Sequence, residues 1–79
     1  MNDSPVTLYT RQGCHLCDVA QALLAQYGLT ARLVDVDQRP ELLAQYGECV
    51  PVVLIDGHVR FRGRINEVLL RRLLRKRST

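Results

Sequence analysis

The chain has 79 residues, of which 47% are hydrophobic and 24% charged, a balance that fits one small globular domain, 1–79, and excludes a disordered or collagen-like chain. The net charge of +3 does not by itself indicate a nucleic-acid partner, because eight of the eleven basic residues lie between Arg60 and Arg77. The longest apolar run, 50–55, is far shorter than the about 20 residues that a membrane span needs, and the first residues lack the order of an export signal. Three cysteines are too few, and odd in number, for the disulfide framework of a secreted protein. We therefore expect a cytoplasmic protein.

The first predicted strand and helix bring a cysteine to a helix N-terminus. Residues 6–9 are apolar and partly β-branched and run into the loop-like Thr10-Arg11-Gln12-Gly13, which indicates a short strand. From Cys14 onward, apolar residues recur at spacings of three and four as far as Tyr27, and Gly28 follows where a C-terminal helix cap is expected. We therefore predict an amphipathic helix that starts at Cys14.

Four further elements are predicted in the middle of the chain. Residues 31–36 favour a second strand, and residues 40–46 favour a short helix with a proline in its first turn. The apolar run at 50–55 predicts a buried third strand, and Asp56-Gly57 is a hairpin turn that leads into a fourth strand at 58–62. The third and fourth strands should therefore pair antiparallel.

The last predicted helix carries most of the positive charge. Asn66 is a suitable N-cap, and Glu67 is well placed against the helix dipole. Because cations are favourable at a helix C-terminus and no aromatic residues for base stacking lie among them, we expect a solvated basic face rather than a nucleic-acid site. The predicted buried face is Ile65, Leu69, Leu70, Leu73 and Leu74, and the basic face is Arg71, Arg72, Arg75, Lys76 and Arg77.

The order βαβαββα predicts an α/β domain with a four-stranded mixed sheet and three helices. Because helices join the first three strands, we expect those strands to be mostly parallel, with one antiparallel strand at an edge of the sheet.

The pattern Cys14-His15-Leu16-Cys17 is a C-x-x-C at the predicted helix N-terminus. There the free N–H groups and the helix dipole favour the thiolate form of Cys14. Cys17 is three residues further on and can close a disulfide with little backbone movement. The pattern predicts a thiol-disulfide oxidoreductase in which Cys14 attacks a substrate disulfide and Cys17 resolves the mixed disulfide.

These residues resemble the glutaredoxins of the thioredoxin superfamily, and more closely a group of short glutaredoxin-like proteins of unknown function. The motif of that group is C-x-L-C followed by an acidic residue, here Cys14-His15-Leu16-Cys17-Asp18. The resemblance implies the thioredoxin fold for nearly the whole chain. It extends to Leu8-Tyr9-Thr10-Arg11, Val34-Asp35-Val36-Asp37, Pro40-Glu41-Leu42, Tyr46-Gly47 and Val50-Pro51.

The resemblance also implies substrate-binding roles for three residues. Pro51 matches a proline that is cis in this fold and lies opposite the cysteine pair, and Val50 offers its backbone to the substrate. Arg11 matches a basic residue that glutaredoxins place near a glutathione carboxylate. We further expect a monomer with no bound cofactor, with glutathione as a candidate co-substrate and another thiol system as the source of electrons.

The sequence is compatible with two kinds of substrate and with two other classes of function. His15-Leu16 stands where most glutaredoxins have Pro-Tyr, and residues 62–67 lack their Gly-Gly and Asp pair, so a protein disulfide and a glutathione mixed disulfide are both candidates. A thioredoxin-fold module that binds a protein without catalysis is one alternative, and Cys49 is either a buried apolar residue or a third reactive thiol. The other alternative is a zinc-binding protein with Cys14, Cys17, Cys49 and His58 as ligands.

Overall fold

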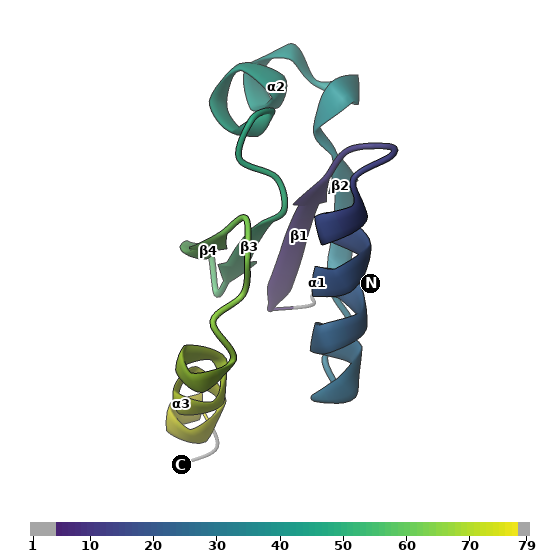
Figure 1. Ribbon diagram of the computed structural model, residues 1–79. Helices are drawn as coiled ribbons and strands as arrows, with labels where there is room; N and C mark the ends of the chain where they lie inside the picture. The colour runs from purple at the N-terminus through teal and green to yellow at the C-terminus, as the bar shows by residue number, and fades with distance from the viewer. Residues whose placement is uncertain (1–4, 78–79) are drawn as a thin grey trace.

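Four strands and three α-helices follow one another along residues 5–77, which are the residues that the computed structural model describes (Figure 1). This confirms the predicted order βαβαββα and the four-stranded mixed sheet with three helices. None of the helices described is long and apolar enough to cross a membrane. The elements are β1 (Val6–Thr10), α1 (His15–Gln26), β2 (Arg32–Asp35), the 3-10 turn η1 (Val36–Gln38), α2 (Pro40–Tyr46), β3 (Val52–Ile55), β4 (His58–Arg62) and α3 (Glu67–Arg77).

The sheet has the strand order β2-β1-β3-β4. β1 and β2 are parallel, whereas β3 is antiparallel to β1 and β4 is antiparallel to β3. The prediction that the first three strands are mostly parallel is therefore wrong for β3. For β3 to be parallel to β2, the connection between them would have to run back along the whole length of the sheet. Instead, β2 ends beside Thr10 and β3 begins beside Tyr9, so the chain leaves and re-enters the sheet at the same end, with η1 and α2 between the two strands.

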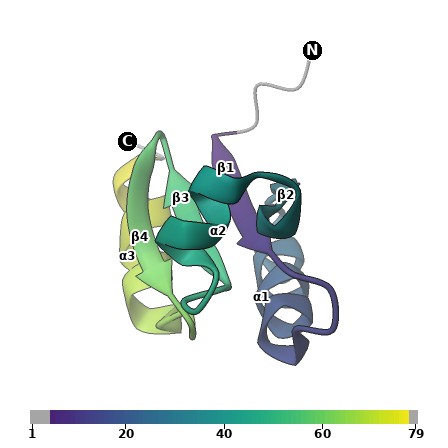
Figure 2. The ribbon, with the colours of Figure 1, turned by 90° about the horizontal axis from the view of Figure 1, so that it is seen from above.

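Helices cover both faces of the sheet. Alternating side chains of a strand point to opposite faces, so β1 and β3 present apolar residues on both faces that the helices bury. On one face α1 and α3 pack against the larger buried cluster, and on the other α2 packs against the smaller one; Figure 2 shows α2 and α3 on opposite sides of the sheet. The larger cluster is Val6, Leu8, Ala20, Leu24, Val53, Ile55, Phe61 and Leu70, and the smaller is Val36, Tyr46 and Val52.

The last helix buries a narrower face than its leucine spacing predicts. Leu70 is fully buried, and Leu73 and Leu74 are partly buried against the larger cluster. Leu69, which we expected to be buried, is 45% exposed. Successive residues of an α-helix differ by about 100° around the axis, so Leu69 lies to one side of Leu70, and the sheet does not cover that side of the helix. The predicted N-cap is confirmed, since the Asn66 side-chain oxygen accepts a hydrogen bond from the backbone N–H of Leu69.

Tyr27, just after α1, contacts the first residue of α3. Its hydroxyl donates a hydrogen bond to a carboxylate oxygen of Glu67. This hydrogen bond is the main cause that raises the pKa of the Tyr27 phenol above its ordinary value, because it stabilises the protonated form. The nearby negative charge of Glu67 acts in the same direction.

We expect Tyr27 to ionise above the usual tyrosine value of about 10. The pKa of Tyr27 is higher in the folded than in the unfolded chain. The contact therefore stabilises the fold fully when the pH is below the pKa of the unfolded chain, and this stabilisation is lost as the pH rises through the pKa of the folded chain. Ultraviolet titration of tyrosinate, taken as the difference between the wild type and Tyr27→Phe, should show this raised midpoint. Glu67→Gln should move the midpoint down. An unshifted midpoint in the wild type would contradict the contact.

Candidate redox site

Cys14 is the N-cap residue of α1, and Cys17 lies in the first turn. The Cys14 backbone is extended, and its sulfur accepts a hydrogen bond from the backbone N–H of Cys17 at a distance of 3.2 Å. The two cysteines are joined by a disulfide, with their Cα atoms 5.2 Å apart. When the disulfide is reduced, the free N–H groups and the positive end of the helix dipole stabilise negative charge on a sulfur at this position.

The two sulfur-bearing residues differ in their access to solvent. Cys14 is half-buried, whereas Cys17 is only 3% exposed. His15 and Leu16, which separate them, are both exposed. A disulfide from outside can therefore approach Cys14, while Cys17 is almost fully buried.

The loop between β1 and α1 sets the position of Cys14. Gly13 adopts a φ of 76°, a left-handed conformation that costs glycine little because it has no Cβ. This conformation turns the chain sharply, and the backbone N–H of Cys14 donates to the carbonyl oxygen of Arg11 at 3.3 Å. The turn therefore delivers Cys14 to the start of the helix directly from the end of β1.

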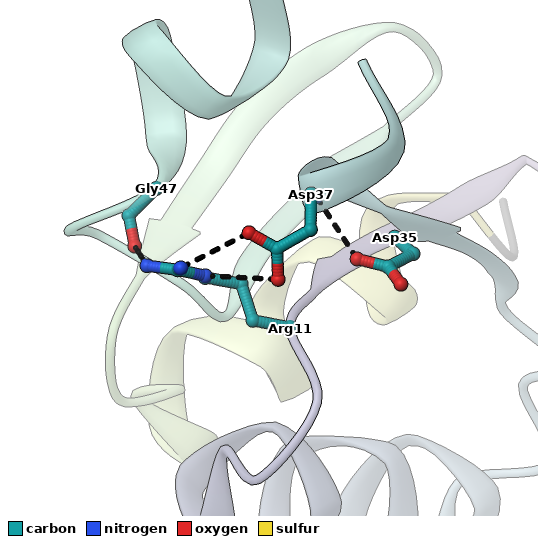
Figure 3. Close-up of polar contacts among 4 residues, drawn as sticks. All are labelled: Arg11, Asp35, Asp37 and Gly47. Atoms are coloured by element: carbon teal, nitrogen blue, oxygen red, sulfur yellow. Dashed lines mark hydrogen bonds and ion pairs between the residues drawn. The ribbon is translucent and has the colours of Figure 1, made fainter. Parts of the chain in front are cut away.

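Arg11 connects this loop to η1 and to the end of α2 (Figure 3). Its Nε and one terminal nitrogen contact the two carboxylate oxygens of Asp37 at 3.2 and 3.0 Å. Its other terminal nitrogen donates to the carbonyl oxygen of Gly47 at 3.2 Å. Asp35 holds Asp37 in place, since its carboxylate accepts the backbone N–H of Asp37 at 2.9 Å. The guanidinium thus fixes the loop that precedes Cys14.

The peptide bond between Val50 and Pro51 is cis, as the resemblance implied. Val52 pairs with Tyr9 in the sheet, so Pro51 lies at the end of the sheet from which the chain leaves β1 toward Cys14. Within residues 5–77, neither the backbone N–H nor the carbonyl of Val50 has a hydrogen-bond partner. Its backbone polar groups are therefore available to pair with another chain.

Gly63, in the loop between β4 and α3, contacts Pro51 and also lies near α1. Its N–H is shared between the carbonyl oxygens of Cys49, at 3.1 Å, and Pro51, at 2.7 Å. The same glycine lines a hollow of about 150 Å³ with residues from α1, including Leu16 of the C-x-x-C. The hollow therefore lies between α1 and the loop that joins β4 to α3, and it includes Leu16, which stands between the two cysteines in the sequence. The hollow is lined by Leu16, Val19, Ala20, Leu23, Gly63, Arg64 and Ile65.

Sequence reasoning singled out Arg11 and Pro51 but missed the residues that hold them, Asp37, Gly47 and Gly63. A signal for Asp37 was present, because it follows a predicted strand whose end meets the end of β1 in a parallel pair. The two glycines act through backbone groups, which leave no side-chain pattern in the sequence.

The third cysteine and the metal alternative can also be placed. Cys49 is half-buried and packs against the cluster formed by Val36, Tyr46 and Val52, on the α2 face of the sheet. In the part of the chain that the structure describes, no group of three or more His, Cys, Asp or Glu side chains is arranged to hold a metal ion. The ligand set expected for zinc, which included Cys14, Cys17 and Cys49, is therefore not assembled among these residues.

Comparison with known proteins gives a consistent family match. Residues 5–75 match the family described as glutaredoxin-like domain (DUF836). An uncharacterized protein of Mycobacterium tuberculosis, Rv0508, is 35% identical over 80 residues, which cover 90% of this chain and 82% of that protein.

Two solved structures extend the match to three dimensions. The protein XcR50 from X. campestris is 35% identical, with a TM-score of 0.75 over 90% of this chain and 96% of its own. The holo form of glutaredoxin C1 from the poplar Populus tremula x tremuloides is 25% identical, with a TM-score of 0.63 over 90% of this chain and 76% of its own.

Proposed function

Because the chain belongs to the glutaredoxin-like domain (DUF836) family, we propose that it is a thiol-disulfide oxidoreductase in which Cys14 and Cys17 are the catalytic pair. The observation that carries this proposal is the placement of the pair: a reachable Cys14 caps helix α1 and is linked by a disulfide to a buried Cys17 in the first turn. We take the whole chain, 1–79, as the catalytic domain.

The proposed reaction starts from the reduced pair. The thiolate of Cys14 attacks one sulfur of a substrate disulfide, so that a new S–S bond forms and the other substrate sulfur leaves as a thiolate that takes up a proton. Deprotonated Cys17 then attacks the Cys14 sulfur, which releases the second substrate thiol and forms the internal disulfide. Two electrons pass from the protein to the substrate. A further thiol system returns them by the reverse exchange at Cys14.

The residues around the pair are proposed to bind the substrate. The unpaired backbone groups of Val50 can form hydrogen bonds with an extended segment that carries the substrate sulfur, and Pro51 shapes the surface against which that segment lies. A guanidinium has five N–H donors, of which Arg11 uses three in its contacts with Asp37 and Gly47. We propose that the remaining two face a substrate carboxylate.

Both a protein disulfide and a glutathione mixed disulfide fit this site as proposed substrates. A buckwheat glutaredoxin solved in complex with glutathione shares the fold of this chain, which supports glutathione as a co-substrate. That the protein holds no cofactor stays our expectation. The exposed Leu16 and the apolar hollow beside it support a larger, partly apolar substrate instead. A monomer acting in the cytoplasm, where other thiol systems can reduce the pair, remains our prediction.

The proposal is tested by assaying the reduced wild type with two substrates, insulin and a mixed disulfide of glutathione with a cysteine peptide. We expect turnover with at least one substrate in the presence of a thiol reductant, and reversible formation of one internal disulfide per chain. Faster turnover of the mixed disulfide would assign glutathione, and faster turnover of insulin would assign protein disulfides. A folded protein that forms the disulfide but turns over neither substrate would favour the non-catalytic binding module.

A further inference from the structure

A second apolar hollow lies between β4 and α3, on the part of the sheet furthest from β2. Its volume is about 320 Å³, roughly twice that of the hollow that Leu16 lines, and the two share no lining residue. It plays no part in the proposed redox reaction. The residues that line it are Arg60, Phe61, Leu69, Arg72 and Leu73.

An irregularity in the strand pairing shapes this hollow. Val53 pairs with Phe61 but its neighbour Leu54 pairs with Val59, so Arg60 is an extra residue on β4. In a regular strand, Arg60 and Phe61 would point to opposite faces. Here the bulge allows both to line the same hollow, with the charge of Arg60 beside the apolar ring.

The floor and rim of the hollow have different chemistry. Phe61 and Leu73 form a mostly buried apolar floor, and Leu69 adds a side chain that is 45% exposed. Arg60 and Arg72 are both exposed at the rim, one from β4 and one from α3. The hollow therefore combines an apolar interior with positive charge on two sides.

The edge of β4 beside this hollow is open, since β4 is the last strand of the sheet formed by residues 5–77. Strand β4 carries Arg60 and Arg62 and no acidic residue. Pairing of β4 with the same strand of a second copy would set like charges side by side, which is unfavourable. The charge of this edge thus favours an acidic partner over another copy of the chain.

We propose that the hollow between β4 and α3 docks an acidic segment of a partner protein that carries a large apolar side chain. The apolar side chain fills the hollow over Phe61 and Leu69, and flanking carboxylates pair with Arg60 and Arg72. An extended segment can also use the unpaired backbone groups of β4. A nucleic-acid backbone matches the charge, but it offers no aliphatic group for the apolar floor.

The probe for this site is a fluorescein-labelled peptide of alternating glutamate and leucine, which presents one acidic and one apolar face as a strand. Fluorescence anisotropy should show saturable binding to the full chain. Arg60→Glu and Arg72→Glu should each weaken binding about tenfold or more. Leu69→Ala should also weaken it, and because Leu69 is half-exposed this variant should fold, as circular dichroism can verify. The matched charge control is Arg32→Glu on β2, at the opposite edge of the sheet.

Two peptide controls and one alternative occupant complete the test. Replacing every leucine of the probe by alanine, or every glutamate by lysine, should abolish saturable binding. Equal losses for Arg60→Glu and Arg32→Glu would overturn the proposal, because attraction would then depend only on net charge. A dimer seen by sedimentation and disrupted by Leu69→Ala would also overturn it, in favour of a second copy as the occupant.

Discussion

Replacing Cys14 by serine should reduce disulfide reduction to the uncatalysed rate. A serine hydroxyl is close in size to the thiol and can still cap α1, so the fold should survive, but it cannot form the mixed disulfide on which the proposed reaction depends. The measurement is turnover of insulin and of a glutathione mixed disulfide, with thermal unfolding as the test of folding. Residual turnover well above background in a folded Cys14→Ser variant would refute the assignment of Cys14 as the nucleophile.

Replacing Cys17 by serine should separate the two halves of the reaction. Cys14 can still attack, but without the resolving thiol the mixed disulfide should accumulate to about one per chain, which intact-mass measurement detects directly. The matched control is Cys49→Ser, which leaves the pair intact and should keep wild-type turnover. A mixed disulfide that resolves in Cys17→Ser but persists in the double variant with Cys49→Ser would show that Cys49 takes part.

Replacing Gly47 by alanine should lower the free energy of unfolding by about 1–3 kcal/mol, the usual range for overpacking a filled site. Gly47 is buried, and a Cβ added to it would lie 2.5 Å from the carbonyl oxygen of Leu43 and 2.8 Å from its Cδ1. The backbone around residue 47 must shift to relieve this contact, and its carbonyl also accepts the hydrogen bond from Arg11.

Thermal unfolding measures this loss, since about 1 kcal/mol corresponds to a Tm shift of about 4–8 °C in a domain of this size. Gln45→Ala, on the exposed surface of the same helix, is the matched control and should change stability by less than about 0.5 kcal/mol. Equal Tm values for Gly47→Ala and Gln45→Ala would show that the crowding at residue 47 is relieved without cost.

Local patterns predicted most elements of this fold, because they depend on neighbours in the sequence. The helix that begins after Cys14, the hairpin turn at Asp56-Gly57 and the N-cap at Asn66 all follow from side-chain spacing or from capping and turn chemistry. The direction of β3 does not. It depends on where α2 lies relative to the sheet, and no spacing in the sequence states that position.

The candidate site shows the same division between local and long-range interactions. The C-x-x-C at the start of α1 is a local pattern, and the cis bond at Val50–Pro51 came from a family resemblance. The contact of Arg11 with Asp37 joins residues 26 positions apart, and their places after two strands do not by themselves state that the side chains pair. Leu69 was misplaced for a similar reason, because helical spacing cannot tell how wide a face the sheet covers.

The unequal burial of the two cysteines has a consequence for the kinetics. Because Cys17 is only 3% exposed, Cys14 is the one sulfur of the pair that a partner can reach. In the proposed cycle, the substrate to be reduced and the thiol that regenerates the protein must therefore use the same sulfur at different times. The two partners compete for one position and cannot bind there together, so oxidation and regeneration alternate in a ping-pong order.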